Sequence, residues 1–339
     1  MLKRGGTGFI GLIVAALAVA ACLRSAPEVV VYTSEDQVFS EPVLKDFEKT
    51  TGIKVRAVYD TEETKSTGVA LRIVAERDHP QADVFWANEP LRPVMLQQQG
   101  LLEVYRSPNG EGIPARYRDA DGYWTGFAAR ARVIVYNTNL VKPEEAPASV
   151  MDLANPRWRG RAGLANPLFG TTTTQIAALF TLWGDAEASR FLEAVKANGV
   201  KLVTSNGEAK DLVASGELAW AFTDTDDASE ALEQHKPVAV VYPDQGGLGT
   251  LVMPNAVALV KGAPHPEPAR KLIDHLLSRD VEEKLAKSTA AQMPLHPDVA
   301  VPANVRPVPT IKDLAVTFAT IGKTIDRVLP YLKRWTGAA

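Results

Sequence analysis

The chain has 339 residues, of which 46% are hydrophobic and 23% are charged, so it can bury substantial cores and divide into two domains. Its 37 basic and 40 acidic residues give a formal net charge of −3, which does not favour nucleic acid or an anionic membrane surface as a partner. The single cysteine, Cys22, leaves no disulfide within the chain, so packing must stabilise the fold.

The N-terminal segment is typical of a bacterial secretory signal. Two basic residues precede an almost unbroken run of apolar and small residues over 9–21, which is too short to span a bilayer. Residues 19–22 resemble a lipobox, which implies cleavage before Cys22 and attachment of a lipid to its sulfur. The alternative is an ordinary signal peptide followed by an incidental cysteine. With a lipobox, 1–21 is the signal peptide, 22–27 is a lipid-anchored linker, and the mature chain has 35 basic against 40 acidic residues, a net charge of −5.

After the signal, strands and helices are expected to alternate. The run of β-branched residues at 29–34 is typical of a buried strand, and the apolar spacing at 42–51 is typical of a helix that ends at Gly52. The order strand, helix, strand, helix, strand predicts a parallel sheet covered on both faces. In this part of the chain we expect strands at 29–34, 53–59 and 82–87, and helices at 42–51, 64–77 and 90–100.

A second series of the same kind follows a strong strand in the middle of the chain and two proline-rich segments. Further strands are expected at 130–136, 162–164, 200–204, 218–223, 238–242 and 250–260. Further helices are expected at 172–183, 186–198, 228–234, 266–277 and 281–287, with a last helix from 311 to the C-terminus. Two successive α/β units with short connections predict two lobes with a cleft between them.

Acidic residues gather where the predicted strands end, and ligands of open α/β sheets lie beyond the carboxyl ends of the strands. Asp224, Asp226 and Asp227 have two interpretations: they begin the helix at 228–234, where a carboxylate offsets the helix dipole, or they hold a ligand whose positive charge relieves their crowding. The other acids could be solvated turn residues or cleft residues. These acids and their polar neighbours, all candidates for the cleft, are Asp36, Asp60, Glu62, Glu89, Tyr32, Ser34 and Asn88.

A second group of residues suits an anion. Four consecutive threonines follow Gly170 at the start of a predicted helix, and exposed amides and hydroxyls there would hold an anion, although one threonine would suffice as a cap. Arg130 and Arg132 lie on one side of a strand, where guanidinium groups suit phosphate or carboxylate unless they form structural ion pairs. The predicted anion site therefore contains Arg130, Arg132, Gly170, Thr171, Thr172 and Thr173.

Segments spread along most of the chain resemble, in sequence order, the periplasmic ferric-ion-binding proteins, a family of extracellular solute-binding proteins of ABC transporters. They are VYTS at 31–34, ADVFW at 82–86, GLL at 100–102, RARVIVYN at 130–137, SVMDLANPRWRG at 149–160, SGE at 215–217 and GAPHP at 262–266. The resemblance covers about residues 28 to 300. It implies an α/β, two-lobed periplasmic-binding-protein (type II) fold with a hinge and an interlobe cleft.

The resemblance also implies lobe boundaries and a partner. The N-terminal lobe would contain 28–131 with 255–305, and the C-terminal lobe 132–254 with 306–339. The strands near 126–132 and 253–257 would join them. The protein would be a monomer without a catalytic cofactor that delivers a solute to the permease of an ABC transporter. It would be lipid-anchored to the membrane, in the periplasm or at the cell surface.

The ligand does not carry over directly from the resemblance. The family typically binds iron through a His, a Glu and two adjacent tyrosines, and these positions fall at Asp36, at Asn88 or Glu89, and at Asp226 with Asp227. An anion-binding Asn of the family matches Asn206. Since the tyrosines are replaced, the expected metal site contains Asp36, Glu89, Asp224, Asp226 and Asp227.

Oxygen donors favour hard cations, so the first expectation is a metal ion, Fe3+ by resemblance or a divalent ion, with phosphate or carbonate as a bridging anion. The second is a phosphonate, a phosphorylated molecule or another zwitterion. A metal-dependent phosphatase is the third hypothesis, and the sequence gives it little support because it has no nucleophile and base in a recognised arrangement and no glycine-rich phosphate loop.

Overall fold

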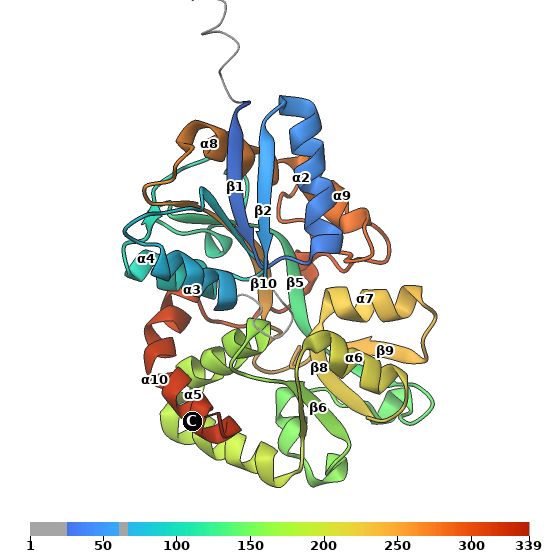
Figure 1. The fold of residues 1–339 in the computed structure, drawn as a ribbon. Coiled ribbons are helices and arrows are strands. Elements are labelled where there is room, and N and C mark those ends of the chain that lie inside the picture. Colours follow the sequence, from blue (N-terminus) through green and yellow to red (C-terminus); the bar gives the residue numbers. More distant parts are fainter. Residues whose placement is uncertain (1–25, 61–66, 339) are drawn as a thin grey trace, which may run out of the picture.

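The computed structural model describes residues 26–60 and 67–338, which form two lobes stacked along the long axis of the molecule (Figure 1). Cys22 and Glu62 lie outside the described residues, so the signal peptide, the lipid anchor and the role of Glu62 stay predictions. Within the described part of the chain, no helix is long and apolar enough to cross a membrane.

The strands form one extended sheet in the order β2-β1-β3-β10-β5-β8-β6-β7, with β4 beside β10 and β9 beside β5. β1 pairs in parallel with β2 and β3, and β6 pairs in parallel with β7 and β8, which confirms the two predicted parallel units. The strands are β1 (Glu28–Thr33), β2 (Lys54–Tyr59), β3 (Val84–Ala87), β4 (Leu102–Glu103), β5 (Trp124–Asn137), β6 (Ala162–Ala165), β7 (Lys201–Val203), β8 (Trp220–Asp224), β9 (Val238–Val241) and β10 (Val252–Val260).

Helices cover the two units, and β5 and β10 pass from one unit to the other (Figure 1). One unit carries α2 (Gln37–Thr51), α3 (Thr67–Ala75), α4 (Leu91–Gln98), α8 (Pro266–Leu276) and α9 (Arg279–Lys287). The other carries α5 (Gly170–Ala197), α6 (Asn206–Ala214) and α7 (Thr225–Glu233). The last helix, α10 (Phe318–Thr336), lies against both α4 and α5 and so contacts the two lobes.

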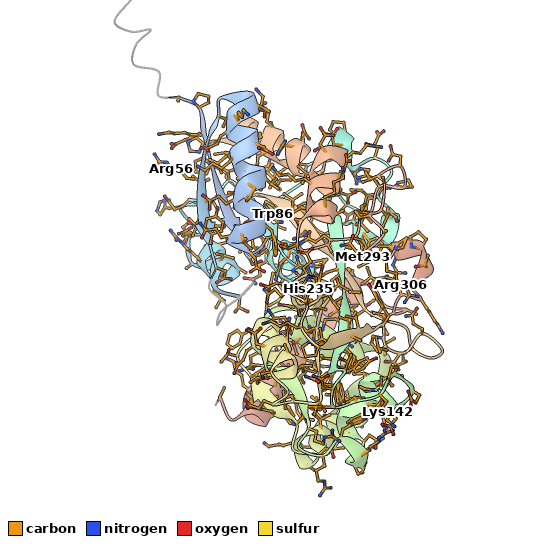
Figure 2. All side chains as sticks on the ribbon, turned by 90° about the vertical axis from the view of Figure 1, so that its right-hand side faces the viewer. Arg56, Trp86, Lys142, His235, Met293 and Arg306 are labelled. Atoms are coloured by element: carbon orange, nitrogen blue, oxygen red, sulfur yellow. The ribbon has the colours of Figure 1, made fainter. Side chains whose placement is uncertain are left out.

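The long strand β5 changes partners along its length. Residues 124–131 pair with β10, whereas residues 132–137 pair with β8 and β9 of the other unit. At the change, the β5–β10 register shifts between Pro254 and Asn255, and Ala128 has a φ of 42°. Met293 pairs with Ala129 and lies at the level where the lobes meet (Figure 2). The irregular pairing bends the two strands where they pass from one lobe to the other.

The buried side chains of Asn255, Gln292 and Trp86 are hydrogen-bonded at this bend. The Asn255 amide donates to the carbonyl oxygen of Ala128 at 2.7 Å and to Gln292 Oε1 at 2.8 Å, and its own Oδ1 accepts from the Trp86 indole at 3.1 Å. A buried amide or indole without a partner would destabilise the fold, so these contacts fix the bend as part of the native structure.

The structure corrects the predicted start of the last helix and adds one helix that the sequence analysis did not predict. The last helix does not begin at 311, because residues 312–314 instead pair with Thr250. The Thr250 amide donates to the carbonyl of Lys312 at 2.8 Å, Leu314 N donates to the carbonyl of Thr250 at 3.0 Å, and α10 starts after the cap at Thr317. The helix α6 was not expected at all. Its Ser205 hydroxyl accepts from Glu208 N at 3.0 Å, which is a cap that the sequence does display.

Candidate binding cleft

Helices from both lobes begin at one narrow cleft. Asp36 is the N-cap residue of α2 and Asn88 precedes α4 in one lobe, while α5, α6 and α7 of the other lobe start directly at the opposite wall. The cleft has about 40 Å³ of free space, which is room for a small ion rather than for a large solute unless the lobes separate. Its described lining is Asp36, Asn88, Arg130, Ala165, Asn166, Phe169, Gly170, Thr171, Thr172, Thr204, Ser205, Asn206, Gly207, Asp224, Asp226 and Asp227.

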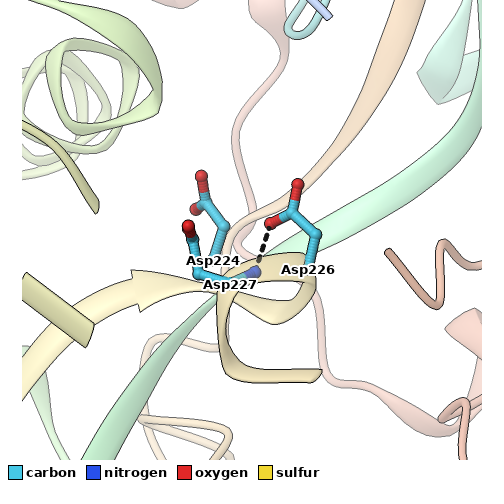
Figure 3. A group of neighbouring side chains, drawn as sticks. All are labelled: Asp224, Asp226 and Asp227. Atoms are coloured by element: carbon cyan, nitrogen blue, oxygen red, sulfur yellow. Dashed lines mark hydrogen bonds between the residues drawn. The ribbon is translucent and has the colours of Figure 1, made fainter. Parts of the chain in front are cut away.

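Three aspartates gather at the end of β8 and the first turn of α7 (Figure 3). One carboxylate oxygen from each of Asp224, Asp226 and Asp227 lies within 4.8 Å of the others. The Thr223 hydroxyl donates to Asp227 Oδ2 at 2.9 Å, and the Asp227 amide donates to Asp226 Oδ1 at 3.1 Å. The positive end of the α7 dipole favours carboxylates at this position. The same three oxygens are close enough to share a cation.

Arg130 bridges acids from the two lobes. Its guanidinium donates to Glu35 Oε2 at 2.5 Å and lies 3.3 Å from Asp226 Oδ2, and it is almost fully buried. Burial by itself would lower the pKa of this guanidinium, but Asp226, Glu35 and Asp224 more than compensate and raise it. Arg130 is therefore permanently charged, and its positive charge offsets the negative charges of Glu35 and Asp226.

Arg132 holds the third aspartate. Its Nη1 donates to Asp224 Oδ1 at 2.8 Å, to Asn206 Oδ1 at 3.0 Å and to Thr171 Oγ1 at 3.1 Å. The other oxygen of Asp224 accepts from the Thr171 hydroxyl at 2.6 Å and from the Asn206 amide at 3.0 Å. Arg132 is completely buried, so it acts within the wall of the cleft rather than on its surface.

The described lining of the cleft contains more acidic than basic residues. Asp36, Asp224, Asp226 and Asp227 line it, and among the described residues Arg130 pairs with Asp226 and Arg132 pairs with Asp224. Counted over these six described groups alone, and with all of them ionised, four negative charges face two positive ones, a balance of −2. Buried Glu35 is a further acid, and it pairs with Arg130. A cation is the natural complement of such a field.

Comparison with known proteins agrees with this architecture. Residues 80–313 match the family model described as bacterial extracellular solute-binding protein. The chain belongs to this family. Iron uptake protein A1 of Synechocystis sp. is 30% identical over 288 residues, which cover 80% of this chain and 79% of that protein.

Two further relatives point to different ligands. A Salmonella typhimurium periplasmic protein named for binding 2-aminoethylphosphonate is 29% identical over 257 residues, which cover 75% of this chain and 73% of that protein. The crystal structure of iron-bound HitA from Pseudomonas aeruginosa has a TM-score of 0.82 at 25% identity, covering 91% of this chain and 99% of that one. This chain is thus a solute-binding protein of the ferric-binding type, and it is not an enzyme.

Within this solute-binding fold, many of the predicted site residues come together although they are distant in sequence. Those that line the cleft are Asp36, Asn88, Arg130, Gly170, Thr171, Thr172, Asn206, Asp224, Asp226 and Asp227. Ser34 holds one of them, Asn88, in place: the Ser34 hydroxyl donates to Asn88 Oδ1 at 3.2 Å and accepts from the backbone N–H of Asn88 at 3.0 Å. That these residues contact a ligand stays a prediction.

Tyr32 does not reach the cleft. Its hydroxyl donates to both Glu76 oxygens, at 2.9 and 3.0 Å, and the Arg72 guanidinium lies 4.7 Å from its ring. Burial, and next the hydrogen bond to Glu76, raises the pKa of Tyr32 to about 12. Tyr32, one of the candidates for the cleft, therefore lies outside its described lining.

Other predicted residues also have structural roles away from the described lining. Glu89 is fully buried and accepts from the amides of Leu91 and Arg92 at 2.5 and 3.2 Å, so it serves the start of α4. Asp60 Oδ2 accepts from the Val69 amide at 3.4 Å near the start of α3. Thr173 is fully buried inside α5.

Sequence reasoning missed two residues behind the cleft. Glu35 pairs with Arg130, and Gln292 donates to the other oxygen of Glu35 at 2.7 Å. Glu35 lies in the same acidic strand end as Asp36, so a signal existed, but its burial was not visible in the sequence. Gln292 lies in an irregular segment far along the chain and offered no signal.

Proposed function

We propose that this protein is the extracytoplasmic receptor of an ABC importer and that it captures a hard metal ion, Fe3+ before others, between its lobes. The observation that carries this proposal is the group of three aspartate oxygens within 4.8 Å of one another in the described lining of the cleft. Carboxylate oxygens are the donors that hard cations prefer. A relative named for iron uptake and a similar protein solved with iron bound support the same ligand class.

Within this proposal, Asp226 and Asp227 ligate the metal from the C-terminal lobe and Asp36 approaches it from the N-terminal lobe. Asp36 and the aspartates of α7 line the same cleft from opposite sides. We take 28–131 with 255–305 as one lobe and 132–254 with 306–339 as the other, since β5 changes partners between Ala131 and Arg132. Closure around the ion would then bring the ligands together.

The N-terminal segment supports placement outside the cytoplasm. We propose that Cys22 carries a lipid and tethers the receptor to the membrane, where it meets its permease. Globomycin treatment, which blocks lipoprotein signal cleavage, should leave the full-length precursor in cells. Processing that is insensitive to the drug would favour the ordinary signal peptide.

A zwitterionic solute is the second candidate, because one relative is named for 2-aminoethylphosphonate and the cleft offers acids for an ammonium group. It ranks lower for a structural reason. The donors that would hold a phosphonate, Arg132, Thr171 and Asn206, are hydrogen-bonded to Asp224.

Calorimetric titration of metal-stripped protein tests the choice. We expect binding of Fe3+ supplied as a nitrilotriacetate complex or of a divalent ion, and no heat with 2-aminoethylphosphonate. Asp226→Asn with Asp227→Asn should weaken metal binding by about 100-fold or more, since loss of supporting groups alone costs 10–100-fold. The control Asp185→Asn alters an exposed aspartate paired with Arg327 and should bind as the wild type does. Heat with the phosphonate and none with any metal would reverse the order of the candidates.

A further inference from the structure

Asp224 differs from its two acidic neighbours in where its side chain is directed. It occupies the N-cap position of α7, yet its carboxylate makes no capping hydrogen bond to that helix. Instead, both oxygens face the starts of α5 and α6: Oδ1 accepts from Arg132, and Oδ2 accepts from Thr171 and Asn206. An aspartate normally stabilises its own helix from the N-cap position, so this orientation needs another explanation.

The groups around Asp224 are those that an oxyanion requires. They are a guanidinium, a hydroxyl at the first turn of α5 and an amide at the first residue of α6, where the helix dipoles also favour negative charge. Arg132 and Thr171 are almost completely buried, so bulk water does not satisfy them. Asn206 Oδ1 accepts from Arg132 at 3.0 Å, which orients the amide nitrogen toward Asp224.

A carboxylate is itself an oxyanion, and Asp224 reaches these donors from the protein side. Its oxygens lie at 2.6 to 3.0 Å from three different side chains, which is full hydrogen-bond contact. Little of the cleft remains for a second anion at this point, since its free space is about 40 Å³.

We propose that Asp224 is a built-in anion, a carboxylate of the protein in the place where a phosphate or carbonate would otherwise bind. The inference rests on the proposed metal-binding function and deepens it: the cargo is a bare hard cation that is captured without an exogenous anion. Arg132, Thr171 and Asn206 then hold Asp224 in position, and they do not bind an anion from solution.

The direct test uses metal-free protein and small anions. Asp224→Ala removes the carboxylate and leaves its donors in a buried space, so phosphate or acetate should bind there and raise the Tm by a few degrees. The metal-free wild-type protein should show no such shift. Asp227→Ala is the matched control, because it removes one negative charge from the same helix start but none of the contacts to Arg132, Thr171 or Asn206.

Equal anion-induced shifts for Asp224→Ala and Asp227→Ala would overturn the proposal, since general loss of negative charge would then suffice. Binding of phosphate to the metal-free wild-type protein, measured by calorimetry, would overturn it as well. This second measurement needs no variant and therefore decides even if Asp224→Ala does not fold.

Metal titrations separate this inference from the function beneath it. Wild-type affinity should be the same with and without phosphate, carbonate or citrate, whereas metal binding by Asp224→Ala should become anion-dependent. A tenfold or greater gain of wild-type affinity with an anion would refute the built-in anion. A wild-type protein that binds no metal would refute the proposed cargo, while the anion shifts of the metal-free variants would still test the role of Asp224.

Discussion

Glu89 shows how a buried acid beside the cleft can be structural. It accepts hydrogen bonds from two amides at the start of α4 and from the Thr174 hydroxyl of α5 at 3.0 Å. Burial raises its pKa, although Arg92 and these donors oppose the rise. Because the folded protein holds this proton more tightly than the unfolded chain, the associated stability is present below the ordinary glutamate pKa of 4.5 and is lost as pH rises through the raised value.

Glu89→Gln tests this role. The neutral amide has no proton to lose, so the free energy of unfolding of the variant should fall less than that of the wild type as pH rises from 4.5 to neutrality. Metal affinity should not change, because Glu89 lies behind the cleft. Urea denaturation across this pH range and one metal titration provide the comparison. If Glu89→Gln instead lost most of its metal affinity while its stability depended on pH as that of the wild type does, Glu89 would be a metal ligand.

At the scale of elements, α5 consists of two helical parts joined at a glycine. Gly184 has φ 77° and ψ 167°, a conformation that is essentially restricted to glycine. The predicted helices at 172–183 and 186–198 correspond to the two parts. The first part brings Gly170, Thr171 and Thr172 to the cleft, and the second packs beside α10, whose Tyr331 hydroxyl reaches the carbonyl of Ser189 at 3.4 Å.

We therefore expect Gly184→Ala to destabilise the protein by about 1–3 kcal/mol through backbone strain alone, since an added Cβ would meet no atom within 4 Å. Gly246→Ala is the control, because its Cβ would also lie in open space and its φ is not in the left-handed region. Thermal unfolding of both variants measures the difference. Equal Tm values would show that the bend at Gly184 carries no strain for alanine.

At the scale of the whole molecule, side chains tie the lobes together on the inner side of the cleft. Arg130 joins Glu35 of one lobe to Asp226 of the other, and Glu89 of one lobe accepts from Thr174 of the other. Gln292 and Asn255 extend the contact from Glu35 to Ala128 at the bend of the two connecting strands. Charged and polar side chains beside the cleft thus form contacts between the two lobes.

Arg130→Met should cost about 3–5 kcal/mol of unfolding free energy, because it leaves Glu35 buried without its cation. Adding Glu35→Gln should recover a large part of this loss. Arg327→Met removes an exposed pair with Asp185 and should cost at most about 1 kcal/mol. Urea denaturation gives all three values, and similar losses for Arg130→Met and Arg327→Met would contradict the bridging role.

The sequence by itself determined the two α/β units, their parallel strands and the presence of acids beyond the strand ends. Periodicity and turn residues involve positions that are close together in the sequence, so these features can be predicted from local sequence patterns. It also placed Asp226 and Asp227 at the start of a helix, where the structure has the first turn of α7.

Only the tertiary structure decided which polar residues face the cleft and which form hydrogen bonds or ion pairs inside the fold. Arg132 is 92 residues from Asp224, and Glu35 is 257 residues from Gln292, so nothing local indicates either contact. Burial decides the rest, because a charge removed from water must find its partner within the fold. This is why Arg130 and Arg132 form ion pairs in the interior. Tyr32 and Glu89 were expected in the cleft from their positions at strand ends, but their hydrogen-bond partners hold them outside its described lining.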